Sequence, residues 1–204
     1  MKPDAPPTDA GSLMTRLDSY IDRVDLDALF GRKAPLEVEV GTGDGGFLLT
    51  RAGQHPERNF IGIERLLGRM RKLDRKGRRA GFTHLRLLRL EAGYVLKYLL
   101  PAASVVVLHI YFPDPWPKKR QRKNRLIQVP FGSVVADVLE PGGCVFVRTD
   151  DLDYFEQMCE VFDGLATLRR VETPLELAEL KTEFERDFER RGIQGLKAGW
   201  RKDP

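Results

Sequence analysis

Five short apolar runs alternate with amphipathic stretches along this chain of 204 residues. The runs lie at residues 36–40, 60–63, 85–90, 104–112 and 144–147. Each run has the length of a β-strand, whereas the stretches between them have the length and apolar spacing of helices. Strands that alternate with helices in this way form a mostly parallel sheet with helices on both faces. We therefore expect an α/β fold with a doubly wound sheet.

Length and composition limit the class of protein. We expect a disordered leader at residues 1–12, which are rich in Pro, Asp and Gly, and a single domain at residues 13–204. No apolar run approaches the roughly 20 residues that span a bilayer, so no membrane contact is expected. Cys144 and Cys159 are too few for a disulfide framework or a zinc site, and the three histidines are scattered, so no metal is expected. A reducing cytoplasm fits this composition, with the protein a monomer or homodimer.

Several helices are expected between and around the strands. The spacing of apolar residues predicts a helix over residues 13–30 that ends at Gly31. Leu66, Met70 and Leu73 form one apolar stripe of a second helix. After Val171 we expect one or two amphipathic helices, followed by a last strand near residues 195–200.

A glycine-rich turn follows the first apolar run directly, at residues 39–46 (EVGTGDGG). Glycines here let the backbone turn tightly and approach a ligand beyond the carboxyl end of a strand. Gly41, Gly43 and Gly46 match the G-x-G-x-x-G pattern of Rossmann-like folds. NAD-dependent enzymes share this pattern, so the turn alone does not identify the ligand.

Three acidic residues follow the first three strands, namely Glu39, Glu64 and Glu91. A carboxylate at Glu39 would repel a pyrophosphate but would suit the ammonium group of a methionine moiety. Glu64 can accept hydrogen bonds from two ribose hydroxyls, a feature that NAD sites share, and Glu91 can accept one from an adenine amine. The alternative is that each acid caps the helix after its strand. Three acids in register with a glycine turn favour a nucleoside ligand.

The segment after the fourth strand is the most informative (YFPDPWPKKR, residues 111–120). Three prolines alternate with Asp114 and Trp116, so the loop is expected to be stiff and extended. Trp116 offers a flat surface on which a base can stack, and a basic run follows at once. The alternative is a rigid turn with a buried tryptophan and a solvated basic tail.

Positive charge is concentrated in two places, although the net charge is only +4. Eight of the fifteen residues at 65–79 and six of the eight at 118–125 are basic. At helical spacing, one stripe forms from Arg65, Arg69, Lys72, Lys76 and Arg79, and Arg71, Arg75 and Arg78 widen it. Such density indicates a polyanion partner, with two solvated faces as the alternative.

Four motifs taken in order resemble the bacterial tRNA (guanine-N7)-methyltransferases, which methylate guanine 46 of tRNA. These motifs are EVGTGDG, NFIGIE, FPDPWPKKR and RTD, and the likeness continues through residues 182–185 (TEFE) to Trp200. It covers nearly all of residues 36–201, and FPDPWPKKR is its most specific part. The resemblance implies a Rossmann-like class I fold that uses S-adenosylmethionine and releases S-adenosylhomocysteine.

The resemblance also implies roles for matching positions. It assigns the cofactor to Glu39, Gly41, Gly43, Glu64, Glu91 and Asp114. Asp114 would in addition be the catalytic residue. It assigns tRNA contacts to Lys118, Asp150, Thr182, Glu183, Phe184 and Glu185, in addition to the two basic segments, residues 65–79 and 118–125.

This chain departs from the family pattern at a few positions. Glu91 stands where Asp is more common, Asp151 where an aromatic residue is expected, and residues 121–124 (QRKN) lack the histidine pair of some members. Thr182 and Glu185 also match a helix capping box, a role compatible with substrate contact.

Two other functions remain open from the sequence. An NAD(P)-dependent oxidoreductase would explain the glycines and Glu64 but gives no role to residues 113–120. A non-catalytic basic RNA-binding module on a Rossmann scaffold would explain the basic segments but gives no reason for Glu39 and Glu91.

Overall fold

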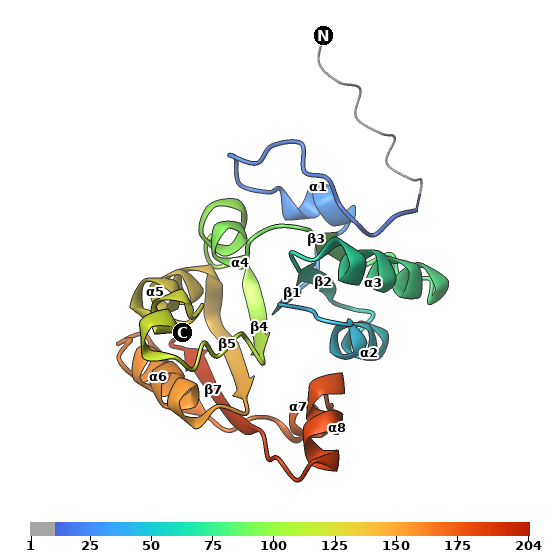
Figure 1. Ribbon diagram of the computed structural model, residues 1–204. Helices are drawn as coiled ribbons and strands as arrows, with labels where there is room; N and C mark the ends of the chain where they lie inside the picture. The colour runs from blue at the N-terminus through green and yellow to red at the C-terminus, as the bar shows by residue number, and fades with distance from the viewer. Residues whose placement is uncertain (1–10) are drawn as a thin grey trace.

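The computed structural model describes residues 11–204, so the expected leader at residues 1–12 lies almost entirely outside the described residues. Seven strands form one sheet in the order β3-β2-β1-β4-β5-β7-β6 (Figure 1). They are β1 (Leu36–Val40), β2 (Asn59–Ile63), β3 (Leu85–Leu88), β4 (Val105–Tyr111), β5 (Leu139–Thr149), β6 (Leu168–Val171) and β7 (Leu196–Lys202). The first five are parallel, and β7 runs antiparallel between β5 and β6. The expected mostly parallel α/β sheet is confirmed.

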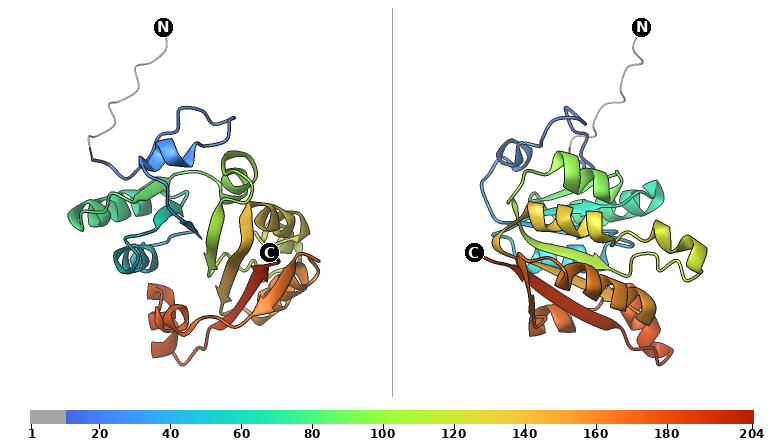
Figure 2. Two further views of the ribbon diagram at one scale, coloured as in Figure 1. Left: turned by 180° about the vertical axis from the view of Figure 1, so that it is seen from behind. Right: turned by 90° about the vertical axis from the view of Figure 1, so that its left-hand side faces the viewer.

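Helices cover both faces of the sheet. They are α1 (Leu26–Phe30), α2 (Gly46–Gln54), α3 (Leu67–Arg79), α4 (Ala92–Tyr94), α5 (Val129–Val138), α6 (Leu152–Asp163), α7 (Leu175–Glu179) and α8 (Glu183–Arg190). A π-helical turn, η1 (Val95–Leu99), continues α4, and a 3₁₀ helix, η2 (Lys119–Asn124), follows β4. The right-hand view of Figure 2 shows α1, α4, α5 and α6 on the near face, where they share one apolar core. The opposite face carries α2, α3 and α7.

Every residue of β1 and β2 is buried, as expected for parallel strands covered on both faces. Strand β1 is bonded to β2 on one side and to β4 on the other. The chain therefore reverses its direction of travel across the sheet at β1, and ligands of open α/β sheets bind outside the carboxyl ends of the strands at such a point.

The expected helix over residues 13–30 is wrong for most of its length. Only α1 is helical there, and it does end at Gly31, which adopts a left-handed conformation with φ of 68°. Upstream, the chain runs along the sheet edge, where Met14 forms a parallel bridge with Leu87. Leu13 and Leu17 have helical spacing but are buried in two different apolar clusters, so their spacing does not mark one helix face.

None of the helices within residues 11–204 has the length and apolar character that crossing a bilayer requires.

Candidate functional site

A cavity of about 720 Å³ opens at the carboxyl ends of β1, β2, β3 and β4. Its wall is formed by residues 39–44, 63–66, 90–92, 111–114 and 182–184, with Phe47, Arg69, Trp116, Asn124 and Leu126. The structure thus brings together all six candidate cofactor positions, namely Glu39, Gly41, Gly43, Glu64, Glu91 and Asp114. Among the candidate substrate residues, Thr182, Glu183 and Phe184 line the same cavity, whereas Lys118, Asp150 and Glu185 do not.

The glycine turn forms the floor of this cavity between β1 and α2. Gly41, Gly43 and Gly45 all have positive φ, of 74°, 54° and 79°. A Cβ atom at Gly45 would lie 2.1 Å from Leu73 Cδ1, so a side chain there would displace Leu73 in addition to straining the left-handed backbone. The expected pattern of Gly41, Gly43 and Gly46 thus matches the left-handed glycines at its first two positions only. The third left-handed glycine is Gly45, and Gly46 begins α2 with an ordinary helical backbone.

Glu39 is the unusual residue of the wall. Its side chain is buried, with 3% of the residue exposed, and Oε2 has no hydrogen-bond partner. Burial raises the pKa of Glu39 well above its usual range, the nearby charges of Asp44 and Glu64 raise it further, and Arg148 opposes them. A buried acceptor without a donor is costly in a folded protein. Within residues 11–204 Glu39 is therefore a buried acceptor that is open to a donor or a positive charge of a ligand in the cavity.

Glu64 and Glu91 already bind backbone groups. Oε1 of Glu64 accepts hydrogen bonds from the N–H groups of Arg65 (2.8 Å) and Leu66 (2.9 Å), and Oε2 accepts one from Gly43 (3.3 Å). Glu91 caps α4 through the N–H groups of Gly93 and Tyr94. The capping interpretation thus holds for Glu91. Since a carboxylate offers about four lone-pair sites, both residues retain acceptor capacity toward the cavity.

The loop after β4 has an uncommon backbone. Phe112 and Trp116 have positive φ, of 51° and 44°, although neither is glycine. Such conformations cost about 1–3 kcal/mol each and persist only where the surroundings hold them. Arg125 supplies one restraint, because its Nε donates to the carbonyl oxygen of Pro115 at 2.7 Å. The result presents Asp114, exposed and without a hydrogen-bond partner among residues 11–204, at the edge of the cavity.

The basic run at residues 118–125 is only partly a free surface. Arg125 is buried, pairs with Asp153 Oδ2 at 2.6 Å and stacks over Tyr154. Arg122 pairs with the same carboxylate at 2.8 Å. The expectation of an exposed polyanion contact is therefore wrong at Arg125, whose charge holds the loop in place. The remaining basic residues of the run are exposed.

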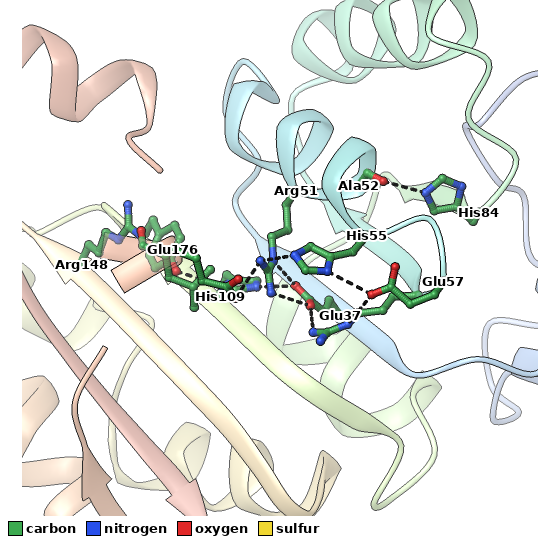
Figure 3. A network of polar contacts seen from close by, with 12 residues as sticks. Glu37, Arg51, Ala52, His55, Glu57, His84, His109, Arg148 and Glu176 are labelled. Carbon is green, nitrogen blue, oxygen red and sulfur yellow. Dashed lines mark hydrogen bonds and ion pairs between the residues drawn. The ribbon is translucent and has the colours of Figure 1, made fainter. Parts of the chain in front are cut away.

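A buried polar network supports the sheet beneath the cavity (Figure 3). Glu37, in the middle of β1, accepts hydrogen bonds from Arg51 (3.0 Å) and from His109 Nε2 (3.1 Å) and also pairs with Arg58. Burial opposes ionisation of Glu37, but the hydrogen bond from His109 and the Arg51 guanidinium outweigh it and hold its pKa below the usual range. Burial lowers the pKa of His109, so a neutral imidazole bonds to the hydroxyl of Tyr111, which lines the cavity.

Sequence reasoning missed two residues that organise this site. Arg125 stood within a basic run, and Arg148 belonged to the RTD motif without a role of its own. Both are buried, and each binds backbone carbonyls of a segment that lines the cavity. The one available signal was the position of Arg148, which directly follows the apolar run at residues 144–147 within β5.

Solved structures define the class of the fold. The chain superposes on the structure of the 16S rRNA methyltransferase KamB with a TM-score of 0.62 at 21% identity, over 90% of this chain and 95% of that one. A family model described as "Putative methyltransferase" matches residues 33–198. Together with the cavity at the glycine turn, these likenesses define a Rossmann-like class I methyltransferase that uses S-adenosylmethionine.

More similar sequences define the family. A tRNA (guanine-N(7)-)-methyltransferase of Sodalis glossinidius (strain morsitans) is 38% identical over 180 residues, which are 86% of this chain and 75% of that protein. One from Alkalilimnicola ehrlichii (strain ATCC BAA-1101 / DSM 17681 / MLHE-1) is 36% identical over 84% of this chain and 72% of its own length. This chain belongs to the tRNA (guanine-N7)-methyltransferase family. Neither an oxidoreductase nor a non-catalytic RNA-binding module is favoured by these relatives.

Proposed function

We propose that this protein transfers the methyl group of S-adenosylmethionine to N7 of guanine in tRNA, at position 46. The observation that carries the proposal is the unpartnered, buried Glu39 beneath the glycine turn, in a chain whose relatives bear that activity by name. Since tRNA is the substrate, we expect the protein to work in the cytoplasm.

The cavity residues fit S-adenosylmethionine end to end. Glu39 would hold the ammonium of the methionine moiety, which would supply the hydrogen-bond donor that Glu39 Oε2 lacks among the described residues. The left-handed turn at Gly41 and Gly43 would let the backbone approach the ligand closely. Glu64 would accept a ribose hydroxyl through the one lone-pair site that its three backbone bonds leave, and Glu91 the adenine amine through a site that its two backbone bonds leave. The cofactor supplies an electrophilic methyl group on a sulfonium.

The methyl transfer does not depend on a general base. Guanine N7 has an exposed lone pair and no proton to lose, so no base is required for its attack. Positive charge passes to the purine as the methyl transfers, and a carboxylate beside the base stabilises that charge. Asp114 is the free carboxylate on the rigid loop at the cavity edge, and we assign the catalytic role to it. Trp116, on the same loop, would stack on the base.

The tRNA would contact surfaces around the cavity. Helix α3 presents Arg69, Lys72 and Arg79 of the basic stripe to solvent, while Met70 and Leu73 are fully buried on its other side. Arg65 precedes the helix, and Lys76 is half-buried and pairs with Asp44 at 3.4 Å. Leu66 departs from the expected apolar stripe, because it precedes the helix and is 54% exposed. We assign phosphate contacts to this stripe and to the exposed basic residues of η2 and its N-cap, namely Lys118, Lys119, Arg120 and Lys123.

Closer to the base, three cavity residues at the start of α8 and one beyond β5 would contact the substrate. Thr182, Glu183 and Phe184 line the cavity opposite the glycine turn. Asp150 is exposed at the end of β5 and has no hydrogen-bond partner in the described part of the chain. The capping box of α8 fixes Thr182 in this position, so the capping and substrate roles are compatible.

Ligand-dependent thermal unfolding tests the class of cofactor. We expect S-adenosylhomocysteine to raise the unfolding temperature progressively with its concentration, as binding to the folded state requires. We expect NAD to leave the unfolding temperature unchanged. Stabilisation by NAD instead would overturn the proposal in favour of an oxidoreductase, and stabilisation by neither would favour an RNA-binding module.

A further inference from the structure

Arg148 is a buried cation whose side-chain hydrogen bonds within residues 11–204 all go to a single segment. It lies on β5 with 1% of the residue exposed. Nη1 donates to Glu185 Oε2 at 2.6 Å and to the carbonyl oxygen of Leu180 at 2.9 Å, and Nη2 donates to the carbonyl oxygen of Leu177. The guanidinium also lies over the ring of Tyr111, with Cζ 4.0 Å from the ring centroid. All three acceptors belong to residues 177–185, which we call the α7–α8 corner.

The corner needs an outside partner to keep its shape. Helix α7 has only five residues, and helices this short are not stable alone. The carbonyls of Leu177 and Leu180 lie at its C-terminal end, where backbone acceptors lack intrahelical partners and a cation is favourable. Glu185 lies in the first turn of α8. One planar guanidinium therefore binds the end of one helix and the beginning of the next.

The outer side of the same corner lines the cavity. Thr182 and Glu183 stand between the two anchor points, Leu180 and Glu185, and they reach the cavity together with Phe184. The carboxylate of Glu185 points away from the cavity, since it also accepts from the N–H of Thr182 (2.9 Å) and pairs with Lys197 (3.1 Å). Its expected role as a direct substrate contact is thus hard to reconcile with its position.

A buried ion pair is weak as a stabilising device, because the loss of hydration offsets much of the attraction. The pair instead fixes the positions of its partners, because a guanidinium holds several acceptors in one plane. The Nε atom of Arg148 has no partner among residues 11–204, so the side-chain hydrogen bonds of Arg148 there all go to the α7–α8 corner. These properties fit a residue that sets the position of other groups.

We propose that Arg148 and Glu185 form a positioning pair that holds the α7–α8 corner against the cavity, so that Thr182, Glu183 and Phe184 meet the guanine in the geometry of methyl transfer. This inference rests on the proposed function of the cavity. It assigns Glu185 an indirect role, exerted through Arg148, in place of direct contact with tRNA.

Two substitutions and their combination test the pair. Arg148→Lys keeps the charge but replaces the planar fork by a point charge that cannot hold all three acceptors. Glu185→Gln keeps an acceptor for the N–H of Thr182 and removes the charge that faces Arg148 and Lys197. Arg169→Lys is the matched control, because Arg169 lies on the exposed edge strand β6 and pairs with Asp203 away from the cavity.

Steady-state methylation of a tRNA transcript gives the first readout. We expect each single variant to lower kcat by about 10- to 100-fold, the scale of a misplacement near 1 Å, while KM for tRNA stays within about twofold of wild type. The double variant should be no slower than the slower single variant, because both act on one corner. Unchanged kcat in a folded Arg148→Lys protein, or penalties that multiply in the double variant, would overturn the proposal.

Limited trypsin cleavage after Lys181 gives a readout that does not depend on activity. Loss of the charge-assisted bonds should accelerate this cleavage about 10- to 100-fold in the native protein, with no change in the Arg169→Lys control. An unchanged rate in both variants would overturn the assignment of the corner. If cleavage accelerates but the wild-type protein methylates no tRNA, the proposed function is wrong while Arg148 still holds the corner.

Discussion

Replacing Glu39 by glutamine should make the protein more stable and a poorer binder of its cofactor. The carboxylate is buried, one of its oxygens lacks a partner, and its pKa is raised by burial and then by the neighbouring acids Asp44 and Glu64. In the unfolded chain the same group ionises at the ordinary pKa of glutamic acid. The substitution removes the charge and nearly preserves the volume, and a buried amide costs less than a buried charge.

The sign and size of this stability difference follow from proton linkage. Between the ordinary and the raised pKa of Glu39, the folded protein binds more protons than the unfolded chain, so the free energy of unfolding falls as pH rises. Each pH unit in this window removes about 1.4 kcal/mol of stability from the wild type. A loss of about 1.4 kcal/mol from the wild type by pH 8 corresponds to an unfolding temperature about 3–6 °C higher for Glu39→Gln than for the wild type, in a protein of this size. Near pH 4 the two proteins should unfold at similar temperatures.

Thermal unfolding by circular dichroism across pH 4–8 measures this difference, and calorimetry with S-adenosylhomocysteine measures binding. We expect Glu39→Gln to bind S-adenosylhomocysteine about 10- to 100-fold more weakly, the scale of one hydrogen bond to a charged group. Glu64→Gln is the matched control, because Glu64 accepts three backbone hydrogen bonds and its replacement should bring no gain in stability. The reasoning is refuted if Glu39→Gln is no more stable than wild type at pH 8 or retains wild-type affinity.

Three further variants address catalysis and tRNA binding. Asp114→Asn should abolish methyl transfer in a folded protein, and near-normal turnover would remove the electrostatic role of this carboxylate. Trp116→Ala should lower kcat/KM about 10- to 100-fold through lost base stacking, which steady-state kinetics would contradict if the ratio were unchanged. Joint replacement of Lys72, Arg75 and Arg79 by glutamine should weaken tRNA binding and flatten its salt dependence by roughly 0.7–0.9 log units per lost phosphate contact, with S-adenosylhomocysteine affinity unchanged. An unaltered salt slope would mean that the stripe is only a solvated face.

The sheet was largely predictable because short apolar strands alternate with helices of ordinary spacing. All five expected parallel strands and the last antiparallel strand are present. Strand β6 escaped prediction because its middle residues, Arg169 and Arg170, are exposed and charged at the sheet edge. The segment before α1 was misassigned because Leu13 and Leu17 serve two separate cores, a tertiary circumstance that sequence spacing does not encode.

The site was predictable where it depends on strand ends and less so where it depends on burial. Glu39 lies near the carboxyl end of β1, and Glu64 and Glu91 follow β2 and β3, so topology alone gathers them at one edge. By contrast, a basic residue looks the same in a sequence whether it faces phosphate or is itself buried against a carboxylate. Arg125 and Arg148 belong to the second kind, and only the packing of α6 and of the α7–α8 corner reveals it.

Nucleoside analysis of methylated tRNA tests the central claim most directly. An unmodified tRNA transcript would be incubated with the protein and methyl-labelled S-adenosylmethionine, then digested to nucleosides, with the Asp114→Ala variant as the inactive control. The account predicts label in 7-methylguanosine alone, and no label when guanine 46 is replaced by adenine. Label in any other nucleoside, label that persists without guanine 46, or no transfer at all by the wild-type protein would contradict it.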